Sequence, residues 1–265
     1  MCVKFSNGEL TMLYLEGNLQ EIVIRCQDAL QVVKNAKDDH HADLGDILSD
    51  LSRAYFEMGQ FSEARLAKEK AVSNDLVTYG ETSHQYISGL CDLATLLRRE
   101  RLGEEALKLL DKALQLVDRR PSGTRQQRHQ VLIGMAKVHA VQGNLERAEQ
   151  DLLQAARQLK CDQLWRSPAF ARVFEFLSQL YERMGKEPAA LRSIEKAIRI
   201  RRASFDMDDF RCAHMLAFQG HLQTQLGDVS SARGSYRTAI DILNRTDRSP
   251  EQVAEIEARL VKLDA

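Results

Sequence analysis

The sequence predicts an all-α protein, a right-handed α-solenoid of about six stacked helix-turn-helix repeats followed by a C-terminal capping helix. Three observations support this fold class. Glycine recurs every 42 residues at five of six positions, and alanine recurs at two fixed distances after it. The 265 residues include only four prolines and are rich in Leu, Ala, Arg, Glu and Gln, which favour helix nearly throughout.

The recurring glycines mark a tight turn between the two helices of each repeat. Their column reads Gly17, Gly59, Arg101, Gly143, Gly185 and Gly227. Glycine adopts the left-handed backbone conformation without a Cβ penalty, so the chain can reverse within two or three residues. Because arginine lacks that freedom, we expect the third repeat to re-form its turn as a shifted loop that uses Gly103.

Two further columns are predicted to let neighbouring helices approach closely. The first reads Ile22, Ala64, Ala106, Ala148, Ala190 and Ala232, and the second reads Ala29, Ala71, Ala113, Ala155, Ala197 and Ala239. The two members within one repeat are seven residues apart, so they share one helical face. Larger apolar residues of the first helices complete the predicted core: Leu48, Leu90, Leu132, Phe174 and Leu216.

The repeats are expected to form one domain over residues 1–265. Their expected ranges are about 3–37, 45–79, 87–121, 129–163, 171–205 and 213–247, with the capping helix at 250–263. Ser167–Pro168 and Ser249–Pro250 each place a capping hydroxyl before a proline suited to the first helical position. Glu, Arg and Lys in the last helix suit the solvated end that a stacked array requires.

Little sequence precedes the first turn glycine. The first repeat is therefore expected to be an irregular cap, or the chain is one part of a longer array. Leu10, Met12, Leu13 and Leu15 would then leave apolar surface exposed, which allows a homodimer through the N-terminal repeat.

The residue order within a repeat resembles the tetratricopeptide repeat. Residues 51–71 read LSRAYFEMGQFSEARLAKEKA, and residues 177–197 read LSQLYERMGKEPAALRSIEKA. The usual period of that family is about 34 residues, and the longer period here is similar to that of kinesin light chains. Over residues 9–245 the resemblance implies a non-enzymatic scaffold or adaptor for protein–protein interaction. The alternative is a regulatory or autoinhibitory module of a larger enzyme or motor assembly.

Charge and composition exclude several classes of partner. The formal net charge of −1 gives no overall attraction to nucleic acid or to an acidic membrane. Basic clusters around Arg98, Arg119 and Arg201 fall on different repeat columns and are interpreted as solvated charge. The sequence contains no run of about 18 apolar residues, the length that would be needed to span a bilayer. Five scattered cysteines without close pairs indicate reduced thiols and a cytoplasmic protein.

The sequence gives no indication of an enzyme. Cys91 and His139 occupy positions that the repeat pattern explains, and neither has a catalytic context nearby. Asp38–Asp39–His40–His41, with Asp43, could supply metal ligands, but an exposed linker is the preferred interpretation. We therefore predict no catalytic, cofactor-binding or metal-binding residues and no cofactor.

A protein or peptide partner is expected on the first helices, which line the concave surface of stacked hairpins. The spacing from the core leucines predicts these partner-binding residues: Asp50, Arg53, Asp92, Thr95, Arg98, Arg99, Ile133, Lys137, Val141, Arg172, Phe176, Gln179, Arg183, Phe218 and His221. The central repeats are basic, and the C-terminal ones offer phenylalanines. This lining suits a peptide or helical segment with acidic and apolar side chains.

One partner known for the family is not expected. Tetratricopeptide domains that hold the acidic tails of heat-shock chaperones use paired Lys and Asn residues on neighbouring first helices. The column that should carry the asparagines reads Asp50, Asp92, Gly134, Phe176 and Phe218. A chaperone tail is therefore disfavoured.

Overall fold

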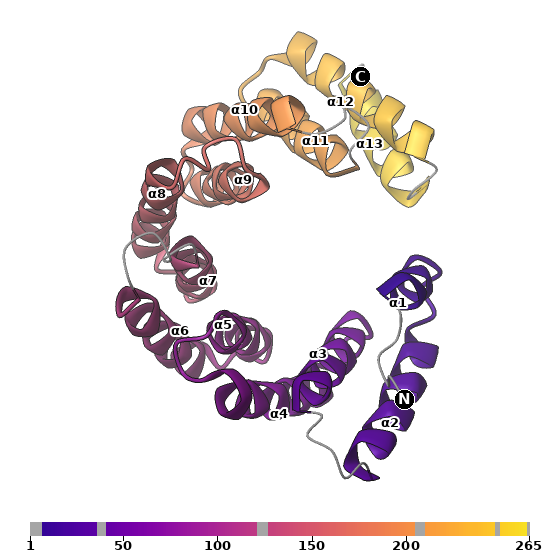
Figure 1. Cartoon of the computed structure of the whole chain (residues 1–265). Coiled ribbons are helices and arrows are strands. Elements are labelled where there is room, and N and C mark those ends of the chain that lie inside the picture. The colour runs from indigo at the N-terminus through magenta and orange to yellow at the C-terminus, as the bar shows by residue number, and fades with distance from the viewer. Residues whose placement is uncertain (1–6, 36–40, 121–126, 205–209, 247–249, 264–265) are drawn as a thin grey trace. The chain divides into compact units, whose positions relative to one another are not determined.

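The computed structural model describes residues 7–35, 41–120, 127–204, 210–246 and 250–263. Within these ranges the chain forms thirteen α-helices and no β-strand, which confirms the all-α prediction. The helices follow one another as packed pairs (Figure 1), as in an α-solenoid. By its internal contacts the chain divides into two compact units, residues 1–142 and 143–265, which are called the first and second units below.

The first unit contains seven helices, and each packs against the next in the chain. The first helix of the third pair, α5, also contacts α7, the first helix of the following pair. The helices are α1 (Asn7–Leu15), α2 (Leu19–Asn35), α3 (His41–Glu57), α4 (Phe61–Tyr79), α5 (His84–Arg99), α6 (Gly103–Asp118) and α7 (Arg128–Val141).

The second unit contains six helices with the same sequential packing. They are α8 (Leu145–Cys161), α9 (Pro168–Arg183), α10 (Glu187–Ser204), α11 (Phe210–Gln225), α12 (Val229–Thr246) and α13 (Pro250–Lys262). The Ser167 hydroxyl accepts a hydrogen bond from the Phe170 amide at 3.2 Å and caps α9, as predicted. Ser249 lies outside the described residues. Ile256 of α13 is buried against the core of the second unit, while most of α13 is exposed.

Every position of the turn column has a positive φ. The five glycines lie between 66° and 84°, and Arg101 lies at 65°. The Leu102 amide donates to the Leu97 carbonyl at 2.9 Å, as the Gln60 amide donates to the Tyr55 carbonyl. The prediction of a shifted loop is therefore wrong: Arg101 takes the glycine conformation, and Gly103 begins α6.

The two small-residue columns are buried as predicted. Every member of the first column is 0% exposed, and no member of the second exceeds 6%. The small side chains leave space for close packing between helices. Ser52 and Ser178, from equivalent positions of first helices, donate hydrogen bonds to the carbonyls of Ala64 and Ala190 in the first column. These bonds tie the first helix of a pair to the second.

Two expectations about exposed residues differ from the structure. Leu10 is 7% exposed and packs with α2 and α3, whereas Met12 is 56% exposed, so of these two residues only Met12 offers apolar surface. The side chain of Leu15 is not among those described. Arg201 is 6% exposed, so its interpretation as solvated charge is wrong.

Candidate functional site

The predicted partner-binding residues all lie on first helices. Those from Asp50 to Val141 are on α3, α5 and α7 of the first unit. Those from Arg172 to His221 are on α9 and α11 of the second unit. Each set therefore belongs to one unit.

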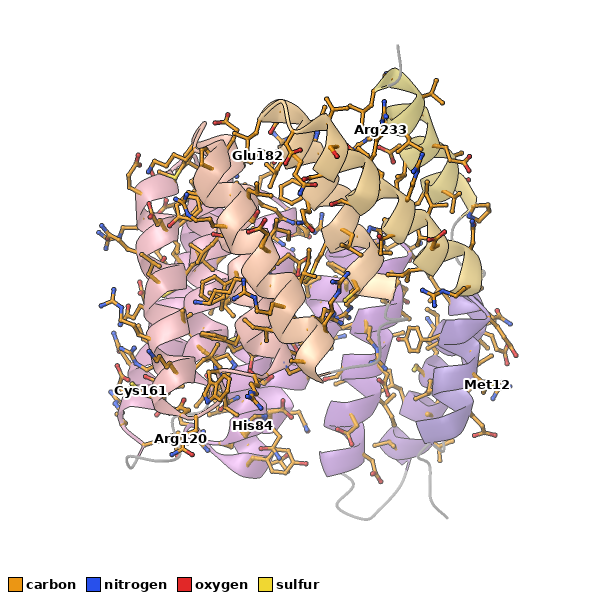
Figure 2. The ribbon with its side chains drawn as sticks, turned by 90° about the horizontal axis from the view of Figure 1, so that it is seen from above. Met12, His84, Arg120, Cys161, Glu182 and Arg233 are labelled. Atoms are coloured by element: carbon orange, nitrogen blue, oxygen red, sulfur yellow. The ribbon has the colours of Figure 1, made fainter. Side chains whose placement is uncertain are left out.

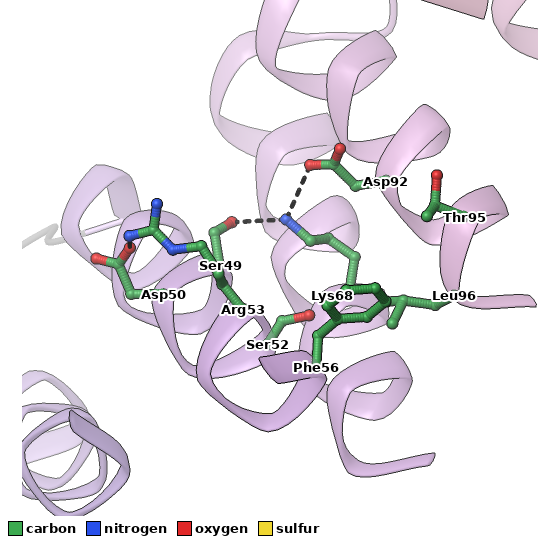
Figure 3. Close-up of a pocket in the computed structure, with 9 residues that line it drawn as sticks. All are labelled: Ser49, Asp50, Ser52, Arg53, Phe56, Lys68, Asp92, Thr95 and Leu96. Atoms are coloured by element: carbon green, nitrogen blue, oxygen red, sulfur yellow. Dashed lines mark hydrogen bonds and ion pairs between the residues drawn. The ribbon is translucent and has the colours of Figure 1, made fainter. Parts of the chain in front are cut away.

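A pocket of about 320 Å³ lies where α3, α4 and α5 meet (Figure 3). It brings together four of the predicted residues and combines polar side chains with the apolar surfaces of a phenylalanine and a leucine. Its lining residues are Ser49, Asp50, Ser52, Arg53, Phe56, Lys68, Asp92, Thr95 and Leu96.

Lys68 is the pocket residue that does not come from a first helix, since it lies on the second helix α4. Its ammonium group donates to Ser49 Oγ at 3.3 Å and to Asp92 Oδ2 at 3.2 Å (Figure 3). The Lys68 side chain is 11% exposed, and that of Asp92 is 52% exposed. The ion pair therefore connects a buried cation to a carboxylate at the surface of α5.

Asp50 and Arg53 form the α3 side of the pocket. The Arg53 guanidinium donates to Asp50 Oδ1 at 2.8 Å and lies 4.4 Å from the centre of the Tyr14 ring. Burial raises the pKa of Asp50, and the nearby Arg53 charge opposes this shift. Arg53 is thus already engaged by groups of its own unit.

Arg98 and Arg99 lie at the C-terminal end of α5, in the turn after the pocket residues Thr95 and Leu96. Arg99 lies over the Phe56 ring, 5.7 Å from its centre. Arg98 is half-buried, and no carboxylate of the described residues pairs with either guanidinium. Burial, together with the charge of Arg99, lowers the pKa of Arg98. Two adjacent cations without an acidic partner attract anions.

The three candidates on α7 differ in exposure. Ile133 is 8% exposed, so it belongs to the packed interior and offers little surface to a partner. Lys137 is half-buried, and Val141 is 57% exposed. Of the three residues predicted on this helix, Lys137 and Val141 are therefore the accessible ones.

In the second unit, Arg172, Gln179 and Arg183 are exposed along α9, and Phe176 is half-buried. On α11 the half-buried residues Phe218 and His221 have ring centres 6.2 Å apart. His221 Nε2 lies 3.0 Å from Glu182 Oε1, so the imidazole already has a partner within its own unit. Glu182, which belongs to α9, is labelled in Figure 2.

A smaller pocket in the second unit, of about 210 Å³, lies between α11, α12 and α13. It brings Phe218 together with residues of all three helices. Its lining residues are Ala213, His214, Ala217, Phe218, Leu243, Gln252, Glu255, Ile256 and Arg259.

The two residues considered for catalysis lie on first helices, as the repeat pattern predicts, whereas His41 and Asp43, expected in a linker, belong to α3. Cys91 and His139 are 6% and 8% exposed, and burial raises the pKa of the Cys91 thiol to about 12. The part of the chain that is described contains no cluster of three His, Cys, Asp or Glu residues that could hold a metal. Asp38, Asp39 and His40 lie outside that part. None of the described helices is both long and apolar enough to cross a membrane.

Comparison with known proteins identifies the repeat. The tetratricopeptide-repeat family model matches residues 11–75. No curated protein sequence matches the chain.

Three solved structures show how far the fold extends. BtubC (BKLC) from P. vanneervenii has 17% identity and a TM-score of 0.70, covering 87% of this chain and 92% of its own. The putative kinesin light chain repeats from Podosopora anserina have 18% identity and a TM-score of 0.62, covering 80% of this chain and 100% of their own.

A Rap protein complexed with competence and sporulation factor has 13% identity and a TM-score of 0.64, covering 97% of this chain and 73% of its own. These identities show similarity of fold alone. Residues 11–75 therefore match the tetratricopeptide-repeat family model, and the chain as a whole has the fold of tetratricopeptide-repeat proteins, including those with kinesin-light-chain-like repeats.

Proposed function

We propose that this chain is a non-enzymatic scaffold or adaptor that binds a peptide or helical segment of a partner protein. The tetratricopeptide fold supports a general role in protein–protein interaction, and the similar Rap structure was solved in complex with competence and sporulation factor. The bound segment carries acidic and apolar side chains. It lies on the first helices of the first unit, α3, α5 and α7.

One observation carries this proposal. Arg98 and Arg99 lack an acidic partner among the described residues and stand one turn from a pocket with polar and apolar walls. Phe56 and Leu96 supply the apolar surface of that pocket. Acidic side chains would pair with the arginines, while an apolar side chain would be buried beside Phe56.

The test uses peptides rather than an assumed partner. A displayed library of random 12-residue peptides is selected on the full chain, and the selected peptides are synthesised for calorimetry. We expect Arg98→Glu with Arg99→Glu to weaken binding more than tenfold, about 1.4 kcal/mol. Lys137→Glu should weaken it in the same direction.

The matched control reverses two exposed lysines on second helices of the same unit, Lys70→Glu with Lys108→Glu. This control changes the net charge equally but leaves the first helices intact. If both double variants weaken binding equally, only the overall charge matters. If neither variant changes the affinity, the proposed binding face is wrong.

A further inference from the structure

Lys68 occupies a position that is apolar in every other repeat. Nine residues after the turn position, the second helices carry Cys26, Lys68, Leu110, Leu152, Ile194 and Tyr236. The five apolar members are between 0% and 3% exposed, and Lys68 is 9% exposed. A buried lysine is costly unless its charge is paired and its hydrogen bonds are made. This one is placed at the base of the pocket between α3, α4 and α5.

The hydrogen bonds of Lys68 leave donor capacity in the pocket. An ammonium group has three N–H donors, and among the described residues Lys68 donates only to Ser49 and Asp92. The Ser49 hydroxyl accepts from Lys68, and within the same described part its own hydrogen has no acceptor. One N–H and one O–H therefore remain for an acceptor that enters the pocket.

We propose that Lys68 and Ser49 form a specific subsite for a carboxylate side chain of the bound peptide, and that Asp92 occupies this subsite until the peptide replaces it. This inference rests on the proposed function and identifies one part of its ligand. The Asp92 side chain is half exposed, so solvent screens its ion pair with Lys68 and little attraction is lost when Asp92 turns into solvent. A second carboxylate beside Asp92 would be repelled, and exchange removes that repulsion.

The occupant is an aspartate or glutamate within a continuing chain, next to an apolar residue. At about 320 Å³ the pocket is near the lower limit for small-ligand sites, about 300–1,000 Å³, which suits individual side chains. Phe56 and Leu96 supply an apolar wall beside Lys68. Arg98 and Arg99, farther along α5, attract acidic residues that follow in the same segment. A continuing segment with several acidic residues therefore matches this surface better than a single terminal carboxylate.

The experiment measures coupling between Lys68 and the peptide carboxylate. Each selected peptide is made with a C-terminal amide, as itself and with its Glu or Asp changed to Gln or Asn. All are titrated against the wild-type chain, Lys68→Leu and Asp92→Asn. Lys70→Leu, an exposed lysine on the same helix, is the matched control. Leucine stands at this position in two other repeats, so Lys68→Leu is expected to fold, and circular dichroism checks this.

We expect the change of the critical Glu or Asp of the peptide to Gln or Asn to weaken binding at least tenfold on the wild-type chain. On Lys68→Leu the same change should weaken binding less than twofold. Asp92→Asn should tighten binding at least threefold because it removes the competing carboxylate. Lys70→Leu should behave as the wild type. If Lys68→Leu fails to fold, Asp92→Asn and the peptides with Gln or Asn still test whether the peptide carboxylate replaces Asp92 at Lys68.

Several outcomes would overturn the subsite. These are equal losses on the wild-type chain and Lys68→Leu, weaker binding by Asp92→Asn, loss of binding by every peptide that carries a C-terminal amide, or a library that yields no binder. Loss of binding with the Arg98 and Arg99 reversals but not with Lys68→Leu rejects the subsite and retains the proposed function. Unchanged binding in all these variants rejects both.

Discussion

At the scale of single residues, burial decides how the titratable side chains behave. Cys26 and Cys91 are 0% and 6% exposed, and burial raises the pKa of each thiol to about 12. Cys212 is 1% exposed. Cys161 is exposed at the end of α8 (Figure 2). The same residue type therefore occupies two very different environments in one chain.

We expect N-ethylmaleimide at pH 8 to modify Cys161 at least about a hundredfold faster than Cys26 or Cys91, because the thiolate is the reactive form. Burial keeps both the thiolate fraction and the access of the reagent low. Peptide mass spectrometry at timed intervals measures the labelling rates. The urea-unfolded chain is the control, in which all cysteines are exposed and should be labelled at similar rates. Fast labelling of Cys91 in the folded chain would contradict its burial.

At the scale of one element, the turn keeps its geometry when its glycine is replaced. Arg101 holds a φ of 65° and the same hydrogen-bond pattern as the glycine turns. The strong helix-forming segments on both sides, α5 and α6, impose this turn. Glycine is preferred at this position because any other residue has a steric cost at positive φ. Packing of the two helices can offset that cost.

This cost can be measured. We expect Arg101→Gly to raise the free energy of unfolding by about 0.5–1 kcal/mol, because glycine adopts a positive φ without steric strain. The matched change is Gly59→Ala, where a Cβ would meet no atom within 4 Å, so only the backbone conformation is tested. It should lower the free energy of unfolding by about 1 kcal/mol. Urea unfolding compares both with the wild type, and a destabilised Arg101→Gly variant would contradict the argument.

At the scale of the whole molecule, the structure changes which apolar residues near the N-terminus are available for self-association. Leu10 is buried in the core of the first unit, and Leu13 packs against it. Among the side chains described near the N-terminus, the large exposed apolar ones are instead Met12 of α1 and Ile24 and Val32 of α2. The homodimer stays a prediction, and so does the alternative role as a regulatory module of a larger assembly.

If a homodimer forms through the N-terminal repeat, Met12→Glu with Ile24→Glu should weaken it at least tenfold, because both charges would enter an apolar contact. Sedimentation equilibrium over a range of concentrations measures the dissociation constant. Val261→Glu, at an exposed apolar residue of α13 in the second unit, is the matched control. A wild-type chain that remains monomeric at high concentration would exclude this dimer.

The candidate site could be predicted in part. First-helix spacing identified Asp50, Arg53, Asp92 and Thr95, which the pocket brings together. It also selected Ile133, which is buried. Lys68 was missed because only first helices were considered, although a lysine in an otherwise apolar column was a visible signal. Periodicity identifies the face of a helix, but how deeply a side chain is buried depends on the neighbouring helices.

The sequence by itself determined the all-α class, the helix pairs, the turn positions and the buried alanine columns. These features are local or repeat at a fixed period, so propensity and spacing are sufficient to predict them. Only the tertiary structure decided that Arg101 keeps the turn, that Arg201 is buried and that Lys68 reaches Asp92 on the next repeat. Those outcomes depend on side chains from different helices meeting in space, and one helical pattern contains no information about such contacts.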